Sequence, residues 1–117
     1  MTYRVIIQPI AVGEMRKAYR WIARHSPRTA ARWYDGLEQA IETLAENPGR
    51  CPLAPEDEYF EEEIRELFHG KRGGVYRILF TISEDTVSVL YVRHGARDHV
   101  RPGEAAEDGE EEEPGPA

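Results

Sequence analysis

Cysteine is almost absent from this chain of 117 residues, because Cys51 is the only one. A single cysteine cannot form an intrachain disulfide or supply a cysteine-rich metal site. Long apolar runs are missing as well, and none approaches the ~20 residues that cross a bilayer. The first apolar run, at 5–7, is too short for a secretory signal peptide. The sequence therefore predicts a cytoplasmic protein with neither a disulfide framework nor a membrane span.

The negative charge of the chain is concentrated at its end. The formal net charge is −7, from 15 Lys and Arg and 22 Asp and Glu. Seven of these acids lie between Glu104 and Glu113, so residues 1–103 hold 22 − 7 = 15 acids against 15 basic residues. The segment 103–117 also lacks aromatic and branched aliphatic residues, which is typical of disorder. We therefore expect one folded domain, 1–102, and an acidic disordered tail, 103–117.

Positive charge gathers in the second half of the folded part. Between Arg65 and Arg101, seven basic residues stand against four acidic ones, a surplus of three. The basic residues are Arg65, Lys71, Arg72, Arg77, Arg93, Arg97 and Arg101. A surplus of this size is compatible with a surface that faces a polyanion, and equally with an ordinary solvated face.

Hydrophobic periodicity predicts one strand followed by two helices. The stretch 3–8 is rich in β-branched and aromatic residues and stops at Pro9, which favours a strand. From 11 to 25 the apolar residues recur at intervals of three and four, the spacing of one helix face. Ser26 and Pro27 supply an N-cap and a first-turn proline for a second helix, which Asn47-Pro48-Gly49 ends. Its apolar stripe consists of Ala30, Trp33, Leu37, Ile41 and Leu44.

Three more strands are predicted after a proline-containing loop at 51–58. The candidates are 62–68, 75–82 and 87–93, with a short hairpin turn at 83–86 between the last two. A two-residue or four-residue loop at this turn sets the same register between the two strands. That register pairs Ile82 with Val87, Phe80 with Val89, Ile78 with Tyr91, and Arg77 with Val92.

This register sorts the side chains of the hairpin onto two faces. One face is apolar and is expected to receive the helices; it carries Tyr76, Ile78, Phe80, Ile82, Val87, Val89 and Tyr91. The other carries Arg77, Thr81, Ser88, Val92 and His94, mixed with further apolar residues. We therefore expect Arg77 and His94 to share a sheet face that the helices leave open, either as functional groups or as half-exposed sheet residues.

The two helices must pack against something flat, because each has a single apolar stripe. Only Ser26 separates the two periodic segments, which predicts a helix hairpin. We therefore predict an α+β fold, in which an N-terminal strand precedes a two-helix hairpin packed on one face of a mostly antiparallel sheet of about four strands.

The order of these elements resembles the RelE/ParE superfamily of bacterial toxins, and several stretches strengthen the likeness. They are Arg65-Glu66-Leu67, the run from Gly70 to Phe80, the run from Asp85 to Leu90, and the closing His94-Gly95-Ala96-Arg97-Asp98. The helix hairpin, with Ala30-Ala31-Arg32-Trp33 and Leu44-Ala45-Glu46-Asn47-Pro48, is similar too. The likeness covers residues 3–99, and it rests on order and spacing because no single motif is diagnostic.

The resemblance implies the toxin of a type II toxin–antitoxin module, whose cognate antitoxin protein wraps the toxin and neutralises it. It leaves the target open. RelE-like members cut messenger RNA on the ribosome, whereas ParE-like members act on DNA gyrase. An inert homologue that only binds a partner is a third possibility.

The site residues that the resemblance implies depend on this choice. A nuclease needs cations around the phosphate, which Arg65, Arg77 and Arg97 match, and a proton carrier, for which His94 or His99 has the suitable pKa. Two departures count against cleavage: Glu63 occupies a position that is basic in RelE-like enzymes, and no aromatic residue follows Tyr91. The ending at 94–98 also resembles the ParE-like one, so the resemblance favours action on gyrase.

Under either mechanism the basic residues are the expected contacts with the target, namely Lys71, Arg72, Arg77, Arg93 and Arg97. An exposed arginine of this kind costs little stability on removal, within about 0.5 kcal/mol. No cofactor or metal is expected, because His94 and His99 lack matched ligands nearby and no helix follows Gly70, Gly73 and Gly74 to bind a phosphate.

Overall fold

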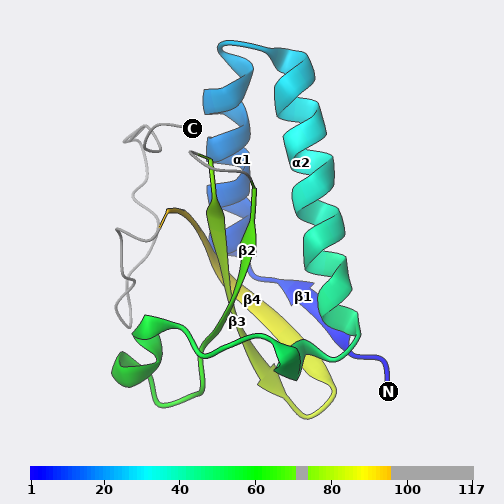
Figure 1. Cartoon of the computed structure of the whole chain (residues 1–117), viewed down its shortest axis with the longest axis vertical. Coiled ribbons are helices and arrows are strands. Elements are labelled where there is room, and N and C mark those ends of the chain that lie inside the picture. Colours follow the sequence, from blue (N-terminus) through cyan, green and yellow to red (C-terminus); the bar gives the residue numbers. More distant parts are fainter. Residues whose placement is uncertain (71–73, 96–117) are drawn as a thin grey trace.

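The computed structural model describes residues 1–70 and 74–95, and it has the predicted α+β architecture (Figure 1). Strand β1 (Arg4–Ile7) leads into helices α1 (Pro9–Ala23) and α2 (Pro27–Glu42). Strands β2 (Arg65–His69), β3 (Tyr76–Ser83) and β4 (Thr86–His94) complete a sheet in the order β1-β4-β3-β2. Three short 3₁₀ helices, η1 (Thr43–Ala45), η2 (Pro48–Arg50) and η3 (Pro55–Tyr59), lie between α2 and β2.

The two helices begin and end close to the predicted positions. Ser26 caps α2, because its Oγ accepts a hydrogen bond of 3.1 Å from the backbone N–H of Thr29. The α-helical part of α2 ends at Glu42, earlier than expected, and continues as η1. The chain then turns at Asn47, which has a φ of 48°, a left-handed conformation that asparagine tolerates better than most residues. The predicted terminator is therefore correct, although the last turn of the helix is a 3₁₀ turn.

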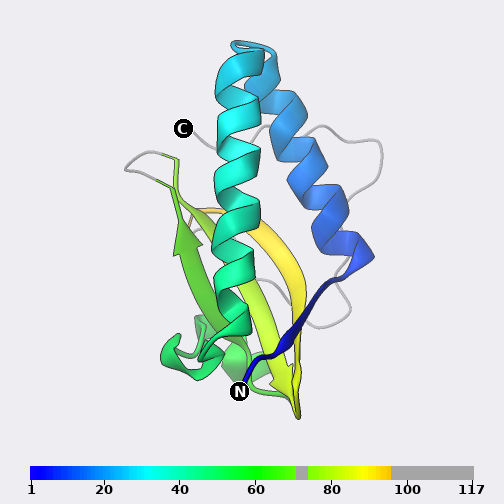
Figure 2. The same ribbon diagram turned by 90° about the vertical axis from the view of Figure 1, so that its right-hand side faces the viewer.

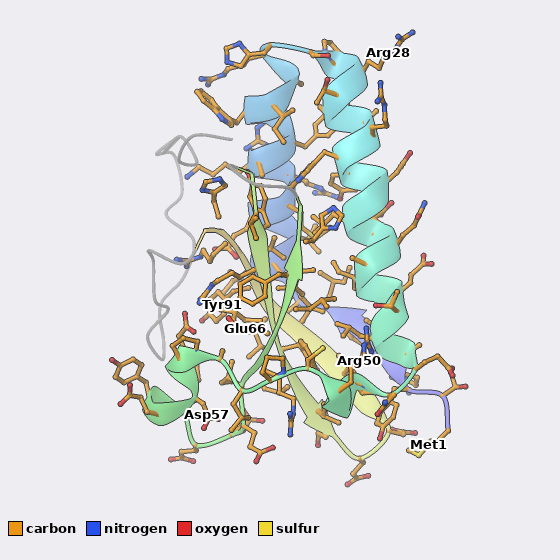
Figure 3. The ribbon with its side chains drawn as sticks, in the orientation of Figure 1. Met1, Arg28, Arg50, Asp57, Glu66 and Tyr91 are labelled. Atoms are coloured by element: carbon orange, nitrogen blue, oxygen red, sulfur yellow. The ribbon has the colours of Figure 1, made fainter. Side chains whose placement is uncertain are left out.

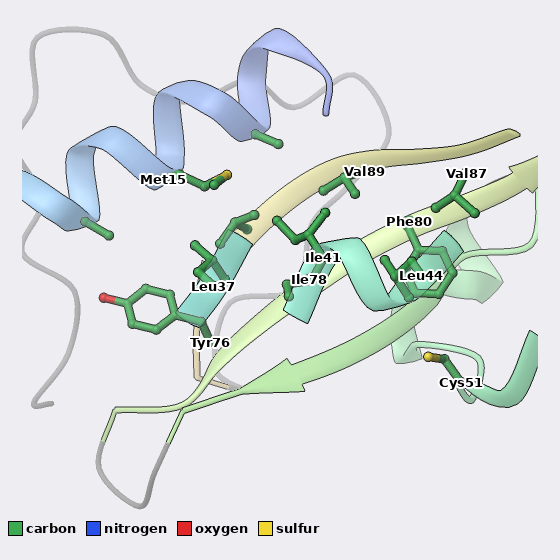
Figure 4. Close-up of a cluster of buried hydrophobic side chains, with 13 residues drawn as sticks. Met15, Leu37, Ile41, Leu44, Cys51, Tyr76, Ile78, Phe80, Val87 and Val89 are labelled. Atoms are coloured by element: carbon green, nitrogen blue, oxygen red, sulfur yellow. The ribbon is translucent and has the colours of Figure 1, made fainter. Parts of the chain in front are cut away.

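The helix hairpin packs on one face of the sheet, as Figure 2 shows. Strand β1 runs parallel to β4, while the other two strand pairs are antiparallel, so the sheet is mostly antiparallel. Helix α2 buries Ala30, Leu37 and Ile41 of its stripe, η1 buries Leu44, and α1 buries Ala11, Met15 and Ala18. All of these side chains except Ala30 meet the inner face of β3 and β4 in one apolar core (Figure 4), which includes Tyr76, Ile78, Phe80, Val87, Val89 and Val92.

The register between β3 and β4 agrees with the prediction only next to the turn. Glu84 and Asp85 form a two-residue turn, and Ile82 pairs with Val87 and Phe80 with Val89, as expected. The register then shifts, because Leu79 pairs with Tyr91 and leaves Leu90 as an extra residue on β4. The predicted pairs of Ile78 with Tyr91 and of Arg77 with Val92 are therefore wrong. Ile78 instead pairs with Val92, and Arg77 pairs with Arg93.

The bulge at Leu90 also exchanges the faces of the residues that follow it. Val92, expected on the face away from the helices, belongs to the core beneath them. Tyr91, expected under the helices, instead packs with Leu79, Ala54 and Ile64 in a second cluster. A period-2 pattern cannot reveal this exchange, because an inserted residue inverts every side chain beyond it.

The outer face of the sheet, which is the face away from the helices, is covered rather than open. The segment 51–64 lies against it and contributes Ala54, Ile64 and Phe60 to the second cluster. The backbone N–H of Ala54 donates a hydrogen bond of 2.7 Å to the carbonyl of Ile64, and that of Glu66 donates one of 3.0 Å to the carbonyl of Pro52. The loop therefore behaves as a second covering layer, which contradicts the expectation of an exposed face.

The turn between β2 and β3 requires glycine at its first position. Gly70 has a φ of +119°, and a Cβ placed there would lie 2.3 Å from the carbonyl oxygen of Gly74. A side chain at position 70 would therefore collide with backbone, which cannot move aside cheaply. In the part of the chain that the structure describes, no helix is long and apolar enough to cross a membrane. The expected acidic tail, 103–117, lies outside the described residues.

Replacing Leu37 tests the packing of α2. Its side chain is fully buried between the hairpin and the sheet, so Leu37→Ala should lower the free energy of unfolding by about 2–5 kcal/mol through lost contacts and a residual cavity. Urea unfolding measures the change, and Glu38→Ala, at an exposed position on the same helix, serves as the control. Equal stabilities of the two variants would contradict the placement of α2.

Candidate functional site

Arg77 was expected on an exposed face, and that expectation is wrong, because its side chain is only 1% exposed. It projects from β3 to the outer face and lies under the segment 51–64. Its Nη2 forms an ion pair with Oε2 of Glu56, and its Nη1 lies 3.3 Å from Oε1 of the same carboxylate. A second carboxylate, Glu66 of β2, lies 3.5 Å from Nη1. Two anions therefore surround one buried guanidinium.

The local sequence explains how these carboxylates reach Arg77. Glu56 lies in the first turn of η3, and its side chain is fully buried. Glu66 pairs across the ladder with Leu79, which is two residues from Arg77 and therefore on the same face. Tyr91 of β4 pairs with Leu79 from the other side and shares this outer face; Figure 3 labels both Glu66 and Tyr91. The acidic segment before β2 thus supplies one counter-ion and β2 supplies the other.

Arg65 does not join Arg77. It pairs with Phe80, whose side chain lies in the core under the helices, so the two arginines project from opposite faces of the sheet. The guanidinium of Arg65 donates a hydrogen bond of 2.6 Å from Nη1 to the carbonyl of Cys51, and its Nη2 lies 3.3 Å from Glu63. Arg65 therefore fastens the start of the loop instead of facing a shared site.

Arg93 lies on the outer face beside Arg77 but is also engaged. Its Nε forms an ion pair with Glu14 of α1, and its guanidinium lies 5.4 Å from the centre of the Tyr91 ring. The other oxygen of Glu14 accepts a hydrogen bond of 2.8 Å from the backbone N–H of Val92. Strand β1 pairs with β4 only as far as Val89. Glu14 therefore accepts the hydrogen bond of a backbone N–H of β4 that β1 does not reach. Arg93 orients that carboxylate.

His94 lies on the helix side of the sheet, not on the face of Arg77 as expected. It pairs with Tyr76, which in turn pairs with His69, so a row of His-Tyr-His crosses three strands at one end of the sheet. The rings of Tyr76 and His94 meet edge-on at 4.9 Å, and Trp33 of α2 lies 4.9 Å from Tyr76. The bulge at Leu90 causes this placement, because it inverts the faces of Tyr91 and all later residues of β4.

Burial disfavours the charged forms of two residues of this row, His69 and Tyr76. It lowers the pKa of His69 from its ordinary 6.5 and raises that of Tyr76 to about 12. The His69 ring packs against α2 at Gly36, where a Cβ would lie 3.2 Å from its Cε1. The row is thus part of the packing between sheet and α2, and its chemistry is separated from Arg77 by the sheet itself.

The remaining predicted residues, Lys71, Arg72, Arg97 and His99, lie outside the described residues. Burial raises the pKa of the Cys51 thiol, so this cysteine is a weak nucleophile. Within residues 1–70 and 74–95, no group of three or more His, Cys, Asp or Glu side chains is arranged to bind a metal ion. The structure therefore brings together Arg77 and Arg93, and it separates both from Arg65 and His94.

Sequence reasoning missed a different surface, the basic hairpin surface formed by Arg16, Lys17, Arg20, Arg24, Arg28 and Arg32. These six residues belong to α1, α2 and the turn between them. The signal was available, because residues 15–34 contain no acidic residue at all. The formal charge of residues 1–103 as a whole hides this surface, because acids elsewhere in that range cancel its positive charge.

The role of Arg77 is tested by its removal. Arg77→Ala should lower the free energy of unfolding by about 3–5 kcal/mol, because Glu56 would remain buried as an uncompensated charge. Arg77→Met combined with Glu56→Gln should recover part of this loss, whereas Arg4→Ala, at an exposed position, should change it by less than about 0.5 kcal/mol. Thermal melting compares the variants, and an unaffected Arg77→Ala protein would contradict the buried ion pair.

Comparison with known proteins agrees with this fold. The chain from residue 5 to residue 99 matches the family model of the ParE toxin of the type II toxin–antitoxin system parDE. Among solved structures, the chromosomal ParDE toxin–antitoxin system of P. aeruginosa is similar, with a TM-score of 0.64, 11% identity, and coverage of 80% of this chain and 96% of that chain.

The toxin–antitoxin complex RelBE2 from Mycobacterium tuberculosis is similar as well, with a TM-score of 0.50, 24% identity, and coverage of 82% of this chain and 94% of that chain. At these identities the two structures support the fold. No curated protein sequence matches the chain. The family match, in contrast, spans most of the chain, from within β1 to beyond the end of β4. The chain therefore belongs to the ParE toxin family of type II toxin–antitoxin systems.

Proposed function

We propose that this ParE toxin arrests growth by binding DNA gyrase, and that it does not cut messenger RNA. The observation that supports the proposal is the burial of Arg77 between Glu56 and Glu66. By the resemblance of the sequence, this arginine matches the position at which RelE-like nucleases place a cation on the phosphate.

Electrostatics argues against a phosphate beside Arg77. Cleavage by transfer to the adjacent 2′-OH requires cations that face the phosphate as charge develops on it. Here the guanidinium is 1% exposed, and Glu56 and Glu66 already neutralise it. Arg65 projects from the other face of the sheet, and so does His94, the expected proton carrier. Because Arg65, Arg77 and Arg93 are engaged in ion pairs with carboxylates of this chain, we propose that the toxin acts by binding a protein.

The partner that neutralises the toxin is proposed to be a cognate antitoxin, since the two similar structures are described as a toxin–antitoxin system and a toxin–antitoxin complex. The edge of the sheet that is formed by β2 offers a contact for such a protein. Phe68 of the edge strand β2 is 51% exposed, and Leu53, beside the same strand, is 45% exposed. An extended segment of a partner can pair with such an edge and cover these side chains. We place both partners in the cytoplasm, where gyrase acts.

Lys71, Arg72 and Arg97 remain the proposed contacts with the target, on the strength of the sequence. Arg77 and Arg93, proposed with them, are engaged with Glu56 and Glu14 and are now expected to act by supporting the sheet. An arginine that meets a protein target presents a planar fork of donors to carboxylates and carbonyls. The remaining candidates lie just after β2 and just after β4 in the chain.

Two purified assays test the choice of target. We expect the full chain, freed from its antitoxin, to inhibit DNA supercoiling by gyrase and to leave ribosome-bound messenger RNA intact. Cells that express it alone should stop DNA synthesis before protein synthesis. Cleavage of the message, with supercoiling unaffected, would establish the nuclease instead. A chain that neither slows growth nor affects either assay would be the inert homologue.

A single substitution tests the target contacts. Arg97→Ala should lower the potency of growth arrest on the order of 10²-fold, because a guanidinium at a protein interface contributes a few kcal/mol of binding. The free energy of unfolding should change by less than about 0.5 kcal/mol. Arg4→Ala, at an exposed position of β1, is the matched control and should stay fully toxic. Unchanged potency of Arg97→Ala would remove Arg97 from the site.

A further inference from the structure

The basic hairpin surface concentrates positive charge at one end of the molecule. Its six Lys and Arg lie within residues 15–34, and all 22 acidic residues of the chain lie outside that range. The formal charge of this segment is therefore +6, in a chain of net charge −7. Figures 1 and 2 both show that the turn between α1 and α2 extends beyond the end of the sheet. The charge is thus displayed on a projecting part of the fold.

The helical periodicity turns these cations outward. In α1 the residues at 11, 15 and 18 face the core, so 16, 20 and 24 form a row on the opposite side. In α2 the buried stripe at 30, 37 and 41 likewise leaves Arg28 and Arg32 on the outer side. All five arginines are exposed, and Arg28 is labelled at the tip of the hairpin in Figure 3.

The charge order along α2 opposes what a helix alone would favour. Arg28 and Arg32 occupy its N-terminal half, whereas Asp35, Glu38 and Glu42 follow toward its C-terminus. The helix dipole favours the reverse order, and neighbouring like charges four residues apart disfavour the helix by about 0.2–0.5 kcal/mol per pair. In α1 the cations lie toward the C-terminus, where the helix dipole favours them. The positions of Arg28 and Arg32 near the N-terminus of α2, in contrast, are not explained by helix stability.

The aromatic residues of the hairpin are not arranged as platforms for unstacked bases. Arg24 lies over the ring of Trp21 at 5.4 Å, and His25 meets the same ring edge-on. Tyr19 and Tyr34 pack against each other edge-on at 5.7 Å, beside Arg16. Single-stranded nucleic acid is bound largely by stacking on aromatic rings, which these contacts do not favour. The surface instead offers rows of cations.

We propose that the basic hairpin surface binds double-stranded DNA through its phosphates, without reading the base sequence. The row 16, 20 and 24 advances by about 6 Å per step, so that it spans about 12 Å, and Arg28 and Arg32 lie on the adjacent antiparallel helix. The phosphates of one DNA strand recur about every 3.4 Å along the duplex axis. Each row therefore meets several phosphates of a rigid backbone. The proposal does not depend on the identity of the toxin's target, since the ligand is DNA alone.

Salt dependence gives the proposal a quantitative signature. Each phosphate contact contributes about 0.9 to the slope of log K against log salt concentration. Loss of two contacts should reduce the magnitude of that slope by about 1.8. At about 0.1 M salt, the same loss should weaken DNA binding by roughly 60-fold. A surface with fewer cations should also lose affinity equally for every base sequence.

The experiment measures binding of the full chain to a fluorescent 30-base-pair DNA duplex by anisotropy, between 50 and 200 mM salt. The test variant is Arg28→Gln with Arg32→Gln. The control variant is Gln39→Glu with Ser83→Glu, which makes the same change of −2 in net charge at exposed positions away from the tip. We expect the parent and the control to bind alike, and the test variant to lose affinity and slope as stated.

Thermal melting shows whether a loss of DNA binding comes from unfolding. The test variant should be at least as stable as the parent, because it lacks the unfavourably placed charges of α2. Three outcomes overturn the proposal: no binding of the parent to the duplex, equal loss in the control and test variants, or tighter binding to single-stranded DNA than to the duplex. An RNA duplex of the same length is a further arm. Preference for it would assign the surface to RNA and overturn the commitment to DNA.

Discussion

The buried ion pair between Arg77 and Glu56 joins the sheet to the long segment that precedes β2. Without this ion pair, Arg77 would lie as an unpaired charge beneath the segment 51–64, and that segment would lose the contact that Glu56 makes with the sheet. With it, the loop packs as a second layer, and Ala54, Ile64 and Leu79 become buried. A buried charge must be paired, because moving an unpaired ion from water into the protein interior costs several kcal/mol. The closed outer face follows from this constraint.

The bulge at Leu90 decides which side chains meet. It places Arg93 directly opposite Arg77 on the outer face, so that two guanidinium groups share a small area with Glu14, Glu56 and Glu66. The same shift places His94 beneath α2, next to Tyr76. Of the described residues that were expected to serve phosphoryl transfer, Arg77 therefore lies on one side of the sheet, and Arg65 and His94 lie on the other.

Charge segregation is the second organising feature. Residues 1–103 are formally neutral as a whole, yet the hairpin tip is strongly positive, while most acids of the described residues lie in the second half of α2 and around the loop before β2. Opposite signs are thus displayed at different ends of one small domain. Such a surface can bind a polyanion at one end without repulsion from the acids at the other, since exposed charges beyond about 10 Å are screened at ordinary salt.

The sequence by itself determined the elements, their order and the class of the fold. The stripe through Leu37, the N-cap at Ser26 and the turn at Glu84 are local patterns, and each depends on residues only a few positions apart. The tertiary structure alone decided the fate of Arg77 and His94. The face of His94 depends on the extra residue Leu90 in β4, which places it beside Tyr76 of another strand. The burial of Arg77 depends on Glu56, which lies 21 positions away in the chain. Local periodicity carries no information about such encounters, because they are set by how a loop and a sheet pack together.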